Sequence, residues 1–224
     1  MLKKSILLWC CLFSTLASGQ NIFTEGLKGS IPTVRFSFEN QEMKPPAYEI
    51  SIDAAGGGEY SAQDETPSPD AATRRHFQVS KATRDRILSL TENLRRFRGD
   101  YEFRKHRIAF SGTKVFTYSE GAEEYSTKFN WSENKDITEL AALFQGIATT
   151  LQAEADLRRL RKFDKLGLDA KLKLMEQQAK SGWLKEIDII SKVLNEIKSD
   201  PQVMGMARAR AQRLLKQAET NRTP

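Results

Sequence analysis

Residues 34–52, VRFSFENQEMKPPAYEISI, carry the strongest structural signal in this chain. Two runs in which apolar and polar side chains alternate are separated by a pair of prolines, which favour extended backbone before them. The alternating apolar positions are Val34, Phe36, Phe38, Tyr48, Ile50 and Ile52. A period of two with aromatic and β-branched residues is typical of half-buried strands. The stretch therefore predicts two strands of a sheet with one apolar face.

The residues that follow extend this pattern. Three glycines at 56–58 allow the backbone to reverse, so a return strand is predicted from Tyr60 and a short fourth strand over residues 76–79. Ser80 is a favourable N-cap, and an apolar stripe between Ala82 and Leu94 predicts a helix. The first unit is thus a strand meander followed by a helix.

A second unit repeats the order of strands and then a helix. Strands are predicted over residues 106–110, 114–118 and 124–130, with Gly-containing turns between them. A long helix is predicted from a cap at Asn134 to about Phe163. Together the two units predict an α+β fold, in which an antiparallel sheet carries helices on one face.

The C-terminal part has a helical pattern throughout. Amphipathic stripes cover residues 168–179, 184–197 and 203–218, and Asp200-Pro201 is a start signal for the last of them. Short helices of this kind must pack on one another to bury their apolar faces. We therefore predict a sheet domain over residues 30–152 and an antiparallel helical bundle over residues 153–218.

The N-terminus predicts export. Lys3 and Lys4 precede an apolar run over residues 6–16, and the small residues 17–19 form a cleavage site. This is the layout of a secretory signal peptide over residues 1–19, which predicts a secreted or periplasmic protein after cleavage near Gly19. Both cysteines, Cys10 and Cys11, lie inside the signal, so the mature chain has no disulfide. An alternative interpretation is that one of them is lipid-modified, which would anchor the protein.

Charge is distributed unevenly along the chain. Residues 20–152 contain 17 Lys/Arg and 19 Asp/Glu, whereas the segment from Ala153 onward contains 16 and 10. Basic tails can contact nucleic acid or anionic lipid. An exported protein rarely meets nucleic acid, and acidic residues are interleaved with the basic ones. The pattern therefore favours a solvated helical surface, and no nucleic-acid partner is predicted.

Residues with catalytic potential are few. The mature chain has no thiol and two histidines, His76 and His106, which are too few for a zinc site without additional carboxylates. Asp100 and Glu102 are two residues apart and could share a strand face, as a hydrolase of the two-carboxylate type requires. No catalytic residue, metal ligand or cofactor is assigned from the sequence.

A basic cluster with interleaved aromatic residues is the best binding candidate. Arginine beside aromatic rings can recognise phosphate, carboxylate or sugar. The predicted binding residues are Arg95, Arg96, Arg98, Tyr101, Arg104 and His106. On a strand, neighbouring side chains face opposite sides, so a solvated surface is the competing interpretation.

Several segments resemble a family of uncharacterised, predicted-secreted bacterial proteins over about residues 30 to 215. The segments are PPAY at 45–48, KHRIAFSG at 105–112, NWSEN at 130–134, LFQGI at 143–147 and DKLGLD at 164–169. The front part also looks like a small bacterial domain of unknown function, with a strand meander, a helix, more strands and a final helix. The resemblance implies export and this order of elements, and it implies no activity.

These observations favour an exported, non-enzymatic binding or scaffold protein of the bacterial envelope. Its partner would be an unidentified envelope protein or polymer, contacted through an aromatic open face of the sheet or through the basic tail. The alternative is a carboxylate-based hydrolase that acts on an envelope polymer. The helical tail could also mediate self-association, and no transmembrane span is predicted in the mature chain.

Overall fold

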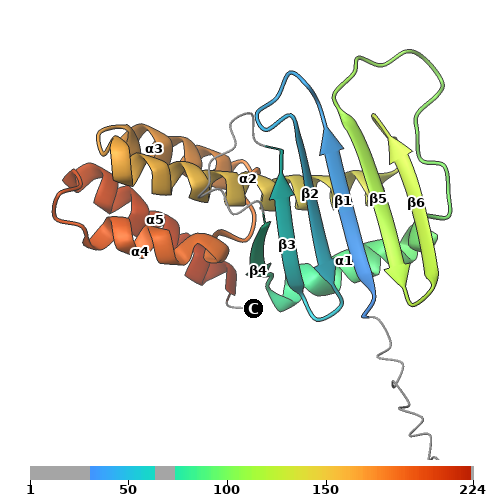
Figure 1. Ribbon diagram of the computed structural model, residues 1–224, viewed down its shortest axis with the longest axis horizontal. Coiled ribbons are helices and arrows are strands. Elements are labelled where there is room, and N and C mark those ends of the chain that lie inside the picture. Colours follow the sequence, from blue (N-terminus) through green and yellow to red (C-terminus); the bar gives the residue numbers. More distant parts are fainter. Residues whose placement is uncertain (1–30, 64–73, 223–224) are drawn as a thin grey trace, which may run out of the picture.

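The computed structural model describes residues 31–63 and 74–222 (Figure 1). The predicted signal peptide, its cleavage site and both cysteines lie outside these ranges, as do residues 64–73 between the predicted third and fourth strands. The strands are β1 (Thr33–Glu39), β2 (Ala47–Asp53), β3 (Gly57–Ala62), β4 (Arg74–Gln78), β5 (Thr113–Glu120) and β6 (Glu123–Phe129). The helices are α1 (Lys81–Asn93), α2 (Lys135–Phe163), α3 (Gly167–Lys180), α4 (Ser191–Ser199) and α5 (Gly205–Arg222), with single turns η1 (Arg95–Phe97) and η2 (Ile187–Ile190).

The described strands form one antiparallel sheet in the order β4-β3-β2-β1-β5-β6, which confirms the α+β prediction. β1 is central, because Phe36 lies opposite Ile50 on β2 and opposite Phe116 on β5. The alternation places these three side chains on the face that α1 and α2 cover (Figure 1).

The expectation of an aromatic open face was wrong. The strand aromatics point toward the helices, and the opposite face carries mostly hydroxyl and charged side chains, such as Arg35, Ser37 and Thr117. The physical reason is that a sheet with helices on one side buries its large apolar residues there and leaves the polar set to water.

Both predicted helix caps are confirmed. The Ser80 hydroxyl accepts a hydrogen bond from the backbone N–H of Thr83 at 3.2 Å. Asn134 Oδ1 accepts from the N–H groups of Asp136 and Ile137 at 3.0 and 3.1 Å. Each side chain satisfies donors that the first helical turn leaves free.

Helix α2 belongs to two hydrophobic cores. From Ile137 to Leu151 its buried residues pack with the sheet and α1. From Ala153 onward they pack with α3, α4 and α5. One continuous helix therefore joins the sheet half of the molecule to the helical half (Figure 1).

Two sequence-based predictions of local structure were wrong. Residues 106–110 are not a strand but part of an irregular segment between η1 and β5. Four successive basic residues, 104–107, are exposed there, and Phe110 is 65% exposed, so the run has no apolar face to bury against a sheet.

The start of the last helix was also misplaced. Helix α5 begins at Gly205 rather than at Asp200-Pro201. Asp200 forms a turn instead, in which its side chain accepts from the N–H of Gln202 at 2.9 Å and its carbonyl accepts from Val203 at 3.1 Å. An Asp side chain that bonds two residues ahead stabilises such a turn as readily as a helix cap.

Candidate functional site

The predicted arginine cluster is divided among separate acidic partners. Arg96 bonds to Glu92 at 2.9 Å and to Glu120 at 3.1 Å. Arg98 lies 3.6 Å from Glu123, and its guanidinium stacks 4.0 Å from the centre of the Tyr125 ring.

The other members of the cluster also have local roles. Arg104 pairs with Asp100 at 2.8 Å, and the Tyr101 hydroxyl donates to the carbonyl of Leu94 at 2.6 Å. The His106 ring packs edge-on against Phe103, with centroids 4.6 Å apart, and Arg95 is exposed. The six residues are thus spread over η1 and the following loop and do not converge on one ligand.

The predicted cluster contains a left-handed backbone turn. Arg95, Arg96 and Phe97 have φ values of 52°, 54° and 64°, a conformation that costs about 1–2 kcal/mol per residue without glycine. Phe97 is 1% exposed and stacks on Phe116 with centroids 5.2 Å apart. Burial of this ring offsets the strain, so the turn has a structural role that no local sequence pattern indicated.

The predicted carboxylate pair does not form an acid and base. The Glu102 backbone N–H and the Arg104 side chain hold the pKa of Asp100 below its ordinary value. Glu102 accepts a hydrogen bond from the backbone N–H of Asn130 at 2.5 Å. A general acid needs a raised pKa, so this geometry gives the hydrolase alternative no support. Over the described ranges, no three His, Asp or Glu side chains lie together as a metal site would require.

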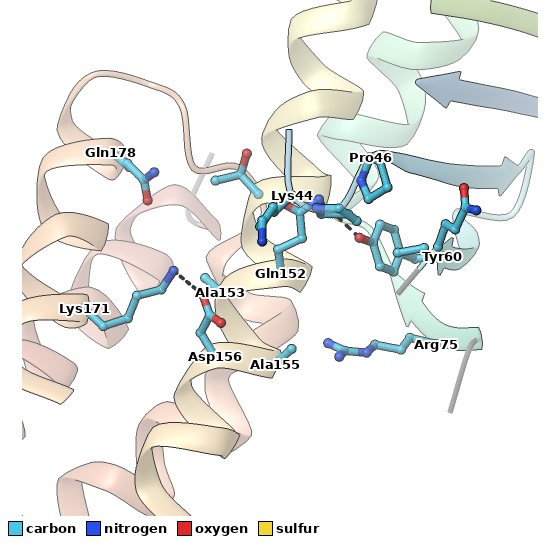
Figure 2. A pocket seen from close by; sticks show the side chains of 14 residues that line it. Lys44, Pro46, Tyr60, Arg75, Gln152, Ala153, Ala155, Asp156, Lys171 and Gln178 are labelled. Carbon is cyan, nitrogen blue, oxygen red and sulfur yellow. Dashed lines mark hydrogen bonds and ion pairs between the residues drawn. The ribbon is translucent and has the colours of Figure 1, made fainter. Parts of the chain in front are cut away.

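A cleft of about 430 Å³ lies where the sheet half meets the helical half (Figure 2). Its walls come from α2, from α3, from the sheet edge at β3 and β4, and from the proline turn before β2. The lining residues are Lys44, Pro45, Pro46, Tyr60, Ala62, Gln63, Arg75, Thr149, Gln152, Ala153, Ala155, Asp156, Lys171 and Gln178. This volume is within the usual range for small-molecule sites.

The charges that line the cleft are mainly positive. Lys44, Arg75 and Lys171 contribute cations from three different elements, against one lining carboxylate, Asp156. Lys171 Nζ bonds to Asp156 at 2.6 Å (Figure 2).

Arg75 is held in place by its own contacts. Its Nη1 donates to the carbonyl of Leu151 at 2.7 Å and lies 3.7 Å from a carboxylate oxygen of Glu154. These bonds fix the guanidinium at the cleft wall and leave its other N–H groups for a further acceptor.

Neutral polar groups complete the lining. Gln152 Nε2 donates to the Tyr60 hydroxyl at 3.2 Å, which links α2 to β3 (Figure 2). Gln178 Oε1 is buried and has no hydrogen-bond partner within residues 31–63 and 74–222. A buried acceptor without a partner costs about 1–3 kcal/mol, so a donor supplied by a ligand would be favourable there.

The sheet half and the helical half are held together by a clamp that centres on Glu186, which does not line the cleft. Its carboxylate accepts from the Ser80 N–H at 2.7 Å, from the Ser80 hydroxyl at 2.9 Å and from the Thr83 hydroxyl at 2.5 Å. A residue of the helical half therefore caps α1 of the sheet half, and anions are favoured at a helix N-terminus.

The same segment crosses α2 at a glycine. A Cβ at Gly146 would overlap the Lys185 side chain, and the Lys185 N–H donates to the Gly146 carbonyl at 3.3 Å. Thr150, one turn further, donates to the Lys185 carbonyl. Glycine is required here because the Lys185 side chain occupies the space that a Cβ would need.

No sequence pattern indicated this cleft. Its cationic residues are at positions 44, 75 and 171, far apart in sequence, and the tertiary structure brings them together. No protein-family model, no curated protein and no solved structure matches this chain. Across the described residues, no helix is long and apolar enough to cross a bilayer.

Proposed function

We propose that this protein is an exported, non-catalytic binding protein of the bacterial envelope, and that it takes an anionic ligand into the cleft between its two halves. The observation that carries the proposal is the convergence of Lys44, Arg75 and Lys171 on one cavity with a single lining carboxylate. Carboxylate and phosphate groups are the natural partners of such a set.

The shape of the site supports binding by a ligand segment rather than by a buried small molecule. The cleft is partly open to solvent at the junction of α2, α3 and the sheet edge. Tyr60 and Gln152 add the hydrogen-bonding groups that an acidic sugar or a similar polymer unit would need. The clamp at Glu186 joins the two halves before a ligand arrives, and a preorganised junction lowers the entropic cost of binding between them.

Export rests on the N-terminal sequence. Residues 1–19 have the charge, the apolar run and the small cleavage residues of a secretory signal. Mass spectrometry of the protein from cell fractions tests this part, because export predicts an N-terminus near Gln20 in the envelope or medium. Intact Met1 on protein retained in the cytoplasm would contradict it.

Binding is tested by calorimetric titration with three probes: inorganic phosphate, an oligogalacturonate tetramer and the neutral maltotetraose. We expect an acidic probe to bind and the neutral one not to bind. Arg75→Gln and Lys171→Gln should each weaken binding about tenfold, which corresponds to about 1.4 kcal/mol.

Lys173→Gln is the matched control, since Lys173 lies two residues away on α3, is exposed and does not line the cleft. It should bind the acidic probe as the wild type does. Equal affinity for the charged and neutral tetramers, or unchanged affinity in both cleft variants, would rule the proposal out.

A further inference from the structure

The end of the helical half that lies farthest from the sheet is formed by two loops, one between α2 and α3 and one between α4 and α5 (Figure 1). We call residues 163–166 and 200–206 the bundle tip. The loops lie side by side, because Lys165 Nζ bonds to Gln202 Oε1 at 2.6 Å and to Asp200 Oδ2 at 3.2 Å.

The bundle tip exposes large apolar side chains from both loops. Phe163 and Leu166 are 73% and 75% exposed, and Met204 and Met206 are 44% and 60% exposed. The helices beneath them are otherwise well packed, with Leu168, Val203 and Ala207 buried close by in sequence. Apolar side chains gathered at one exposed end mark a contact surface.

Basic residues surround these side chains. Residues 159–167 and 198–208 together contain six Lys/Arg and two Asp. Both aspartates have partners within the tip: Asp200 bonds to Lys165, and Asp164 Oδ1 accepts from the N–H of Gly167 at 3.1 Å. Glu196 pairs with Arg161 at 2.6 Å, and Asp156 lies 3.7 Å from Arg159. Among the described residues, no ion pair neutralises Lys162, Lys198 or Arg208, so the surface as a whole remains positive.

We propose that the bundle tip docks on an anionic phospholipid surface. Phe163, Leu166 and the two methionines enter the headgroup boundary, and the surrounding lysines and arginines contact lipid phosphates. Apolar side chains with a basic surround are the combination that binds the interface of anionic bilayers. Charge complementarity selects this partner over a second copy of the chain, because two positive tips repel each other.

Docking in this way orients the molecule. Helix α3 has 14 residues, so it spans about 20 Å between the bundle tip and the sheet half. The cleft and the open sheet face then stand away from the lipid, available to other partners. The inference does not depend on what the cleft binds.

The test is co-sedimentation with vesicles of phosphatidylglycerol and phosphatidylcholine in equal parts, compared with vesicles of pure phosphatidylcholine. Mass spectrometry first checks that the wild type and all variants begin at the same residue. Differences in binding then cannot come from residues 1–19. We expect binding to the anionic vesicles, at least fivefold less binding to the neutral ones, and weaker binding in high salt.

The double variant Phe163→Ser/Leu166→Ser should lose binding at least tenfold. Leu174→Ser/Trp183→Ser is its control, because these side chains are also exposed, at 45% and 66%, but lie outside the bundle tip. All four sites are on the surface, so both variants should keep the wild-type unfolding midpoint.

Equal binding by the tip variant and the wild type would overturn the proposal, as would equal binding to both vesicle types. Sedimentation velocity without lipid gives a further arm. If the wild type forms a dimer, and the tip variant abolishes the dimer but leaves vesicle binding unchanged, the tip mediates self-association. That result would refute lipid docking.

Discussion

The two halves of this molecule share one helix but are packed in different ways. In the sheet half, rings dominate the core: Phe36, Phe116 and Phe144 lie within 4.8 to 5.6 Å of one another between centroids. In the helical half, the buried residues are aliphatic, methionine or alanine, from Ala153 and Leu157 on α2 to Ala218 on α5.

The difference between the aromatic and the aliphatic core follows from the shapes of the elements that pack together. A helix lying on a twisted sheet leaves an uneven space that large rings fill, and tilted ring pairs add about 0.5–1.5 kcal/mol beyond their buried area. Helices approach one another closely when small side chains face the contact, as Ala207 and Ala211 do on α5. Ion pairs also join helices in this half: Arg210 on α5 bonds to Asp169 and Glu176 on α3.

The largest expected effect tests the aromatic core. Phe116→Ala should lower the free energy of unfolding by about 4 kcal/mol, because it removes a fully buried ring that contacts Phe36, Phe97 and Phe144. Urea denaturation measures the loss. Val115→Ala, the next position on β5 but on the open face, should cost under about 1 kcal/mol. Equal losses would show that the two sheet faces are not distinct.

The next prediction concerns the clamp between the halves. Glu186→Ala should lower the free energy of unfolding by about 2 kcal/mol, since Ser80 and Thr83 lose the carboxylate that caps α1. Lys192→Ala, an exposed neighbour, is the control. During denaturation, the fluorescence of Trp131 reports on the sheet half and the fluorescence of Trp183 reports on the helical half. No loss at either reporter would argue against the clamp.

At alkaline pH the sheet half should weaken first. Burial and a hydrogen bond to Glu120 raise the pKa of Tyr118 to about 12. The unfolded chain releases this proton near pH 10, whereas the folded protein keeps it to higher pH. The contribution of Tyr118 to the free energy of unfolding is therefore fully present below pH 10 and is lost as pH rises toward 12. Tyr118→Phe should remove about 1 kcal/mol of the decline between pH 9 and 11. An unchanged decline in thermal midpoint would contradict this.

At acid pH the helical half should become less stable. This is the smallest of the four changes in the free energy of unfolding predicted here. Partial burial acts to raise the pKa of Glu176, but hydrogen bonds from Arg213 and Arg210 outweigh it and lower the pKa. The stabilisation is therefore present above pH 4.5 and is lost as pH falls through the lowered pKa. Glu176→Gln should cost about 0.5–1 kcal/mol at pH 7 and flatten the acid limb of the stability curve. Circular dichroism against pH measures it.

Local features of the fold could be predicted because they depend on short-range geometry. The alternation at Val34, Phe36 and Phe38 identified the buried face, and Ser80 and Asn134 identified two helix starts. The strand predicted over residues 106–110 failed because alternation indicates a strand only where one face has a core to enter.

The candidate site was beyond prediction of this kind. The arginines proposed from the sequence are near one another along the chain, yet Arg96, Arg98 and Arg104 pair with different carboxylates. The cleft instead joins Lys44, Arg75 and Lys171. Proximity in sequence therefore does not place basic residues around one cavity, since convergence depends on how distant elements pack.

What the sequence determined by itself is the class of each segment and the direction in which its side chains face. Periods of 2 and 3.6 residues follow from backbone geometry and need no knowledge of the rest of the chain. Only the tertiary structure decided that β1 lies between β2 and β5, that Glu186 caps α1 and that the two halves enclose a basic cleft. Those contacts join residues far apart in sequence. They can stabilise the protein only after the two cores on either side of α2 have formed.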